Sequence, residues 1–251
     1  MTVFGVVVPT AEGIFNHGQC VQRHALSRTH HQHNACIRSG CIWLTSSAAH
    51  AGSRYAVNDV SPWSSTPPTY SGGMKIVIPG GTGQVGGILR RALAARGHEV
   101  VVLSRHAGAL EPGVRHTPWD GRSLGAWASE IDGADAVINL AGRTVSCRYT
   151  EENLRQMMDS RVESTRVVGE AIAKAAAPPR VWLQMSTATI YADRRDAPND
   201  ESTGIIGGHE PGVPGYWEYS VRIAQTWEAT QLTADVPETR KVQLRAAMVM
   251  S

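Results

Sequence analysis

From Met74 onward, short apolar runs alternate with longer segments that carry a single apolar stripe. A short apolar run is typical of a buried parallel strand, whereas a stripe with a period of about 3.6 residues is typical of an amphipathic helix. Regular alternation of the two indicates an α/β fold built on a doubly wound parallel sheet. We therefore predict a Rossmann-like domain over residues 74–251.

The predicted domain contains six strands, expected at residues 75–79, 99–103, 114–119, 134–142, 180–186 and 241–249. Helices are expected at 84–96, at 124–131, from Thr150 to the Pro178-Pro179 pair, and at 219–232. Thr150 suits an N-cap, and the acidic side chains that follow it favour the start of a helix. The apolar stripe of this long helix is predicted to consist of Leu154, Met158, Val162, Thr165, Val168 and Ile172, and that of the first helix of Val85, Leu89 and Leu93.

Residues 1–73 carry no sustained period of either kind, which favours a disordered N-terminal extension. The alternative is that Met74 is the true start and the upstream residues are not part of the protein. Soft metal ligands crowd this segment, but their spacing lacks the paired cysteines of a zinc knuckle, so no metal site is predicted. These ligands are Cys20, His24, His30, His31, His33, Cys36 and Cys41.

Charge and composition exclude several classes of partner. The net charge of +2 comes from the first 73 residues, and the remainder is balanced, so no nucleic-acid partner is predicted. No apolar run is long enough to span a membrane, and residues 1–9 lack the basic start of a signal peptide. Cys147 alone lies beyond residue 73, so no disulfide framework is expected. We predict a cytoplasmic protein with a small-molecule substrate, and make no prediction of its oligomeric state.

A glycine-rich turn joins the first predicted strand to the first predicted helix. Its glycines match both G-x-G-x-x-G and G-x-x-G-x-x-G, and a second strand begins after Gly97. Bare backbone amides at such a turn bind the diphosphate of a dinucleotide at the positive end of the helix dipole. The alternative is a tight strand-to-helix turn that binds no ligand. The residues assigned to this cradle are Gly80, Gly81, Thr82, Gly83, Gln84, Val85 and Gly86.

The second predicted strand ends in Leu103-Ser104-Arg105, without the acidic residue that an NAD site offers to the ribose 2′-hydroxyl. Ser104 can donate a hydrogen bond to a phosphate, and Arg105 can pair with it through two nitrogens. This ending favours NADP over NAD. The alternative is that Arg105 is an ordinary solvated residue after a strand.

Three motifs in this order give the chain a resemblance to the extended short-chain dehydrogenase/reductase superfamily: the glycine turn, Asn139-Leu-Ala-Gly142 and Ser186-Thr-Ala-Thr-Ile-Tyr191. The Ser160-Arg161-x-x-x-Thr165 segment and the Trp227-Glu228 pair resemble its epimerase-like branch. The resemblance covers residues 74–251. It implies an NAD(P)-dependent epimerase/dehydratase-like oxidoreductase that transfers hydride at an oxygen-bearing carbon, for example on a nucleotide-sugar.

The resemblance also implies that the backbone of Ala141 and Gly142 passes beside the coenzyme, where a larger side chain would collide with it. Tight packing against the first helix explains Ala141 equally well. Asp120 occupies a position where related chains touch adenine, and a capping role in the next turn is its equal alternative.

For catalysis, the resemblance assigns the hydroxyl position after the fifth strand to Thr187, although a strand-end Thr also satisfies local backbone. Tyr219 is the candidate proton-transfer tyrosine, but no Lys follows it at the fourth position or occurs anywhere between residues 175 and 240. An unassisted tyrosine titrates near a pKa of about 10, so only about one part in a thousand is phenolate at neutral pH. Packing of Tyr219 on the sheet is the alternative, and Asp200-Glu201 is interpreted as solvated loop charge.

Extended members of the superfamily build a C-terminal substrate domain beyond the sixth strand, and this domain is expected to be largely missing here. The lost Lys and the missing domain leave a second function open, a non-catalytic module that binds NADP(H) or acts in regulation.

Overall fold

The computed structural model describes residues 72–106 and 110–247. The expected strands and helices are found in the expected order. The strands are β1 (Lys75–Pro79), β2 (Glu99–Ser104), β3 (Val114–Pro118), β4 (Ala136–Asn139), β5 (Val181–Thr187) and β6 (Arg240–Ala246). The helices are α1 (Gln84–Ala94), α2 (Glu151–Lys174) and α3 (Gly215–Leu232), with 3-10 helices η1 (Ala126–Glu130) and η2 (Ala188–Ile190).

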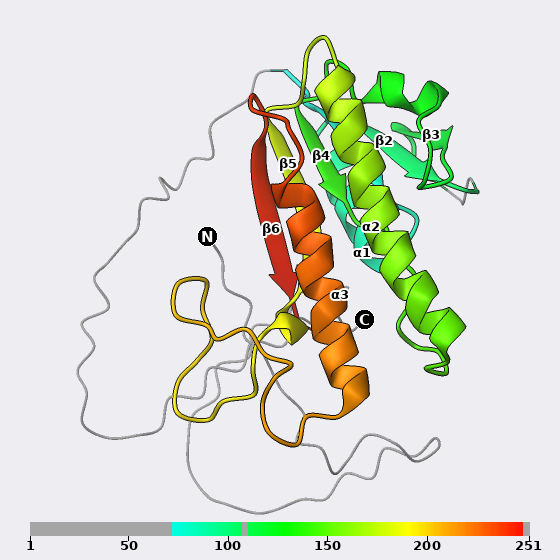
Figure 1. Cartoon of the computed structure of the whole chain (residues 1–251). Helices are drawn as coiled ribbons and strands as arrows, with labels where there is room; N and C mark the ends of the chain where they lie inside the picture. Colours follow the sequence, from blue (N-terminus) through cyan, green and yellow to red (C-terminus); the bar gives the residue numbers. More distant parts are fainter. Residues whose placement is uncertain (1–71, 107–109, 248–251) are drawn as a thin grey trace, which may run out of the picture.

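The strands form one parallel sheet in the order β3-β2-β1-β4-β5-β6, which confirms the doubly wound fold (Figure 1). The chain moves outward from β1 to β3, returns to β4 beside β1, and then continues outward to β6. The direction of winding therefore reverses between β1 and β4. In sheets of this kind, the crevice beyond the carboxyl ends of the strands at the reversal point is where ligands bind.

Two apolar layers cover the sheet, one on each face. Val77, Val101, Val137 and Trp182 point to the face covered by α2 and η1, where they join the larger core cluster. Ile76, Ile78, Val100 and Val102 point to the other face, where Leu93 of α1 packs on them. All eight strand side chains are buried, as expected for strands with helices on both faces.

Several boundaries differ from the sequence expectation for local reasons. The helix expected at 124–131 is a 3-10 helix of five residues, which places Trp127 edge-on to Trp119 with 5.6 Å between ring centroids. The fourth strand is limited to Ala136–Asn139, and the sixth ends at Ala246. The last helix begins four residues early, at Gly215, directly after Pro214. Proline has no N–H to lose at a helix start, which explains the early beginning.

The long helix α2 is capped as expected, since the Thr150 hydroxyl accepts a hydrogen bond from the N–H of Asn153 at 3.2 Å. Its predicted stripe is half correct. Thr165, Val168 and Ile172 are buried, whereas Leu154, Met158 and Val162 are only half-buried. The burial in the second half of α2 follows from its packing on the sheet core and on α3.

A buried ion pair fastens α3 to β5 and β6. Arg245 donates two hydrogen bonds to the carboxylate of Glu228, at 2.8 and 2.7 Å, and Ser186 donates a further one. The exposed fractions of the side chains are 24% for Arg245 and 6% for Glu228. The hydrogen bonds that Arg245 donates to Glu228 are the largest cause that raises the pKa of Arg245 above its ordinary value. The contact between α3 and the sheet therefore depends on the Glu228 carboxylate and on the hydrogen bonds that it accepts from Arg245 and Ser186.

Loss of this carboxylate is expected to destabilise the fold. Glu228→Ala leaves the largely buried Arg245 guanidinium without a carboxylate, and breaking a buried ion pair in this way costs about 3 kcal/mol of unfolding free energy. Glu218→Ala, an exposed position of the same helix, is the matched control and is expected to cost less than about 1 kcal/mol. Urea unfolding followed by circular dichroism measures both, and equal losses would contradict the assignment.

Candidate coenzyme site

The glycine turn after β1 is held by close backbone contacts. Gly80 has a φ of +75°, and a Cβ atom on it would lie 2.7 Å from the N and Cα atoms of Ala141. Its N–H donates to the Leu103 carbonyl at 2.8 Å. A Cβ on Gly86 would lie 2.4 Å from the Gly81 carbonyl oxygen. These glycines are therefore required by the turn itself, whether or not it binds a ligand.

Gly83 differs from the other glycines of the turn. A Cβ on it would meet nothing closer than the Gly80 carbonyl oxygen at 3.7 Å, and its φ of −72° is open to any residue. Gly83 is exposed at the helix start, so its missing side chain leaves open space rather than relieving a clash. This vacant space is what a backbone approach to a diphosphate requires.

The start of α1 offers unpaired donors to this space. Gly83 is the N-cap and supplies no side chain to the first turn, which also contains no acidic residue. The first N–H groups of a helix have no intrahelical acceptor and carry the positive end of its dipole. The turn therefore fits an anionic group held by backbone amides, as a dinucleotide requires.

At the end of β2, Ser104 and Arg105 have different environments. Ser104 is buried, and its hydroxyl donates to the His106 carbonyl at 2.7 Å and lies 3.0 Å from Nε2 of His116. Arg105 is exposed. A phosphate contact from Ser104 would compete with its local hydrogen bond, so Arg105 is the more accessible of the two candidates.

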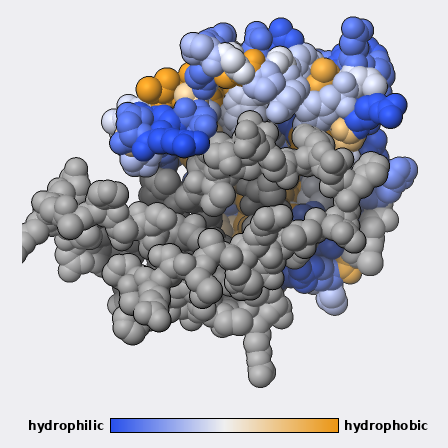
Figure 2. All heavy atoms as spheres, turned by 90° about the horizontal axis from the view of Figure 1, so that it is seen from below, coloured by the Kyte–Doolittle hydropathy of each residue, from blue (hydrophilic) through white to orange (hydrophobic). Residues whose placement is uncertain are grey.

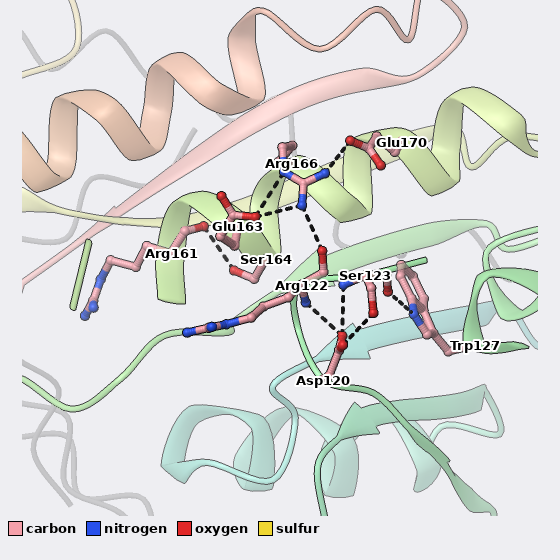
Figure 3. A network of polar contacts seen from close by, with 9 residues as sticks. All are labelled: Asp120, Arg122, Ser123, Trp127, Arg161, Glu163, Ser164, Arg166 and Glu170. Carbon is pink, nitrogen blue, oxygen red and sulfur yellow. Dashed lines mark hydrogen bonds and ion pairs between the residues drawn. The ribbon is translucent and has the colours of Figure 1, made fainter. Parts of the chain in front are cut away.

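The loop after β3 is tied down by Asp120 and by α2 (Figure 3). The Asp120 carboxylate accepts from the N–H groups of Arg122 and Ser123 at 2.8 and 3.0 Å, and from the Ser123 hydroxyl at 2.5 Å. These bonds, led by the Ser123 hydroxyl, lower the pKa of Asp120 to about 2. Arg166 of α2 donates to the Arg122 carbonyl at 2.8 Å. The capping interpretation of Asp120 accounts for its contacts.

The turn after β4 lies against the glycine turn. The amide N–H of Ala141 donates to the Asn139 side chain at 3.1 Å, and the Asn139 amide donates to Gln184 of β5 at 3.0 Å. Asn139 and Gln184 are both fully buried. The sequence motif identified Asn139 but not Gln184, since their contact crosses two neighbouring strands. The pair holds the backbone of Ala141 beside Gly80, and Gly142 follows directly.

The candidate catalytic residues lie after β5 and on α3. The Thr187 hydroxyl donates to the Thr189 hydroxyl at 2.9 Å and accepts from the Thr189 N–H at 3.2 Å, so it caps η2. Tyr219 is half-buried near the start of α3, and the Arg222 guanidinium lies over its ring, 4.5 Å from the centroid. Arg222 thus turns toward Tyr219, but it stacks on the ring face. Both side chains thus have partners within the chain, Thr187 in Thr189 and Tyr219 in Arg222.

Tyr191, which contacts the Arg245–Glu228 ion pair, was not predicted as a site residue from the sequence. Its hydroxyl accepts a hydrogen bond from Arg245 at 2.6 Å, and its ring packs with Ile190 and Ala224. A single guanidinium therefore joins Tyr191, directly after η2, to the Glu228 carboxylate. The contact could not be foreseen, because Tyr191 and Arg245 lie 54 residues apart.

The acidic loop residue Asp200 is a turn cap. Its carboxylate accepts from the N–H groups of Ser202 and Thr203 at 2.8 and 2.6 Å. These bonds, led by the one from Thr203, lower the pKa of Asp200 to about 2. A carboxyl group with so low a pKa is a poor general acid or base near neutral pH. The interpretation of Asp200 as loop charge agrees with these contacts.

Metal clusters and membrane-spanning helices are both absent from the described residues. Over residues 72–106 and 110–247, no cluster of three or more His, Cys, Asp or Glu side chains could hold a metal ion. No helix in the same ranges has the length and apolar content to cross a membrane. Hydrophilic residues predominate among the coloured atoms of Figure 2. The Cys- and His-rich segment lies outside the described residues, as does the extension predicted over 1–73 except for Gly72 and Gly73.

Comparison with known proteins identifies the family. Residues 76–211 match the NAD dependent epimerase/dehydratase family, and this match covers more than half of the chain. The chain belongs to that family. The superfamily resemblance inferred from the motifs is thereby confirmed.

Relatives and solved structures agree with this membership. The epimerase family protein SDR39U1 of Homo sapiens is 32% identical over 181 residues, 70% of this chain and 55% of that protein. A crystal structure of human SDR39U1 with NADPH has a TM-score of 0.55 at 31% identity, and covers 68% of this chain and 53% of that one. A nucleoside-diphosphate sugar epimerase from Corynebacterium glutamicum has a TM-score of 0.51 at 26% identity, covering 69% and 33%. The chain spans about half the length of the curated relatives it matches.

The contrast between Gly83 and Gly86 gives a direct test of the cradle. Gly83→Ala is expected to keep the unfolding free energy within about 1 kcal/mol, because its Cβ meets no clash, but to weaken coenzyme binding at least about tenfold. Gly86→Ala is expected to cost about 2 kcal/mol or more, because its Cβ collides with the Gly81 backbone.

Gly87→Ala is the matched control, since a Cβ there meets only the flexible Arg91 side chain at 3.5 Å. We expect it to keep both stability and coenzyme affinity. Quenching of tryptophan fluorescence by NADPH, with thermal melts of each variant, measures these effects. Unchanged coenzyme affinity in Gly83→Ala would remove the diphosphate from this turn.

Proposed function

We propose that this chain binds NADP(H) and forms the coenzyme-binding part of an epimerase or oxidoreductase that acts at an oxygen-bearing carbon. The observation that carries the proposal is the open space at Gly83 beside the uncapped start of α1. Family membership supports a dinucleotide as the occupant of this space. The residues that would hold it are those of the glycine turn, with Ala141 and Gly142 beside it.

Two observations favour NADP over NAD. Arg105 is exposed directly after β2, where its guanidinium can pair with a 2′-phosphate, and the strand ends without an acidic residue. Human SDR39U1, at 31% identity, has a crystal structure with NADPH. More distant neighbours with the same fold, at 17% and 18% identity, were solved with NAD, so the fold alone does not select the coenzyme.

When bound, the nicotinamide group accepts or donates hydride. In this proposal, the chain's own residues orient the substrate and move a proton. The Thr187 hydroxyl, at the carboxyl end of β5, would donate a hydrogen bond to the substrate oxygen. Tyr219 is the proton-transfer candidate on α3. A nucleotide-sugar is the proposed substrate class, supported by the sugar-nucleotide epimerase among the solved relatives.

A non-catalytic NADP(H)-binding module is the second candidate function. The stacking of Arg222 on the Tyr219 ring favours it, because a guanidinium above the ring face does not replace a lysine near the hydroxyl. The engagement of the Thr187 hydroxyl by Thr189 favours it as well. Cytoplasmic location and the extent of the N-terminal extension stay predictions.

Coenzyme choice is tested by charge reversal at Arg105. Arg105→Asp is expected to raise the Kd for NADPH at least about tenfold, and to change the Kd for NADH less than about threefold. Arg96→Asp, an exposed arginine beyond α1, is the charge-matched control and should leave both values unchanged. Equal losses for the two coenzymes would remove the phosphate as the reason for the preference.

Turnover separates the two candidate functions. We expect the protein to oxidise NADPH, to reduce NADP or to epimerise the sugar when sugar nucleotides are supplied. Thr187→Val is expected to lower kcat by about a hundredfold with the NADPH Kd unchanged. A spectrophotometric assay at about 340 nm, where reduced nicotinamide absorbs, detects net hydride transfer. Product chromatography detects epimerisation. Tight NADPH binding with no product across the panel would favour the non-catalytic module.

A further inference from the structure

Arg161 of α2 lies at the edge of the coenzyme cradle. A Cβ atom on Gly142 would lie 3.4 Å from both Cγ and Cζ of Arg161 and 3.6 Å from its Nε atom. Gly142 directly follows Ala141, whose backbone touches the glycine turn at Gly80. The guanidinium is therefore packed beside the exposed loop that borders the candidate site.

This guanidinium has no acidic partner among the described residues. Its Nη1 atom donates to the Met157 carbonyl of the same helix at 2.9 Å, and its Cζ atom lies 5.0 Å from the ring centroid of Trp227. Arg166, one turn further along α2, forms ion pairs with Glu163 and Glu170. Figure 3 shows the two arginines projecting in different directions, with Arg161 pointing away from those carboxylates.

Burial makes this arrangement unfavourable for an isolated charge. Desolvation is the largest influence on Arg161 and lowers its pKa, while the neighbouring Tyr149 raises it. Arginine nevertheless stays protonated at neutral pH. A partly buried cation without a counter-charge lowers the stability of the fold. Such a residue is commonly kept where a ligand supplies the missing negative charge.

Two exposed tyrosines border the same region. Tyr149, before α2, and Tyr216, in the first turn of α3, meet edge to face with 6.3 Å between ring centroids. Their exposed fractions are 42% and 47%. Aromatic faces of this kind stack on planar rings and on the apolar face of sugars. Because Tyr149 also acts electrostatically on Arg161, the Arg161 charge lies near a surface suited to a ring.

We propose that Arg161 binds an oxyanion of the substrate, a phosphate or carboxylate, and that Tyr149 and Tyr216 contact the attached ring. The inference rests on the proposed function, because it places the substrate beside the coenzyme. The charges of the coenzyme are assigned elsewhere, the diphosphate to the glycine turn and the 2′-phosphate to Arg105. A guanidinium fork matches the planar pair of oxygens that both kinds of anion present.

The test uses the full chain saturated with NADPH, so that the cradle does not bind the probes. UDP, inorganic pyrophosphate and malonate are titrated by isothermal calorimetry, while NADPH fluorescence reports any displacement of the coenzyme. We expect the wild type to bind at least one probe, and UDP to bind more tightly than pyrophosphate because only UDP carries a ring. Arg161→Met should weaken this binding about tenfold or more and change the NADPH Kd less than twofold.

Arg166→Met is the matched control, a paired arginine on the same helix, and should change probe affinity less than twofold. Arg161→Met is also expected to melt no lower than the wild type, because methionine keeps the apolar contact with Trp227 and removes the desolvated charge. Should it fail to fold, Arg161→Lys keeps the charge without the fork and is expected to weaken probe binding as well.

Three outcomes would overturn the inference: no binding of any probe by the NADPH-saturated wild type, equal probe affinity in Arg161→Met, or an equal loss of NADPH and probe affinity in that variant. The first two leave the proposed function intact. If NADPH itself does not bind, the proposed function fails. Titration of UDP into the coenzyme-free wild type and both variants then decides the role of Arg161 separately.

Discussion

The close approach of two backbone turns, one after β1 and one after β4, is the constraint on which the candidate site depends. Gly80 and Ala141 come so near that a single added methyl group would lie 2.7 Å from main-chain atoms. The contact occurs where the strand order reverses, at the carboxyl edge of the sheet. It explains why the two turns form one surface although about sixty residues separate them.

The sequence predicted the parts of this surface that depend on local rules. Strand β1, the glycine turn and α1 follow from an apolar run, bare backbone and a helical stripe, all within twenty residues. The parallel sheet follows from the alternation of strands and helices. These features are local or repetitive, and a pattern along the chain is sufficient to indicate them.

The features that the sequence did not predict depend on contacts between distant residues. Gln184 supports Asn139 from a neighbouring strand, and Arg245 reaches Tyr191 from the edge strand β6. The same holds for Arg161, whose guanidinium lies over the ring of Trp227 on another helix, a contact that no local pattern indicates. Short elements were misjudged for a related reason. The five residues of η1 are shaped by the packing of Trp127 on Trp119 rather than by helix propensity.

Arg166 connects helix α2 to the loop after β3. One guanidinium holds two glutamates of α2 and, at the same time, the carbonyl of Arg122 in the loop after β3. Outward displacement of that loop would break a hydrogen bond to the middle of a 24-residue helix. The position of the loop after β3 is thus coupled to that of α2, and a shift of either element is transmitted to the other through one guanidinium.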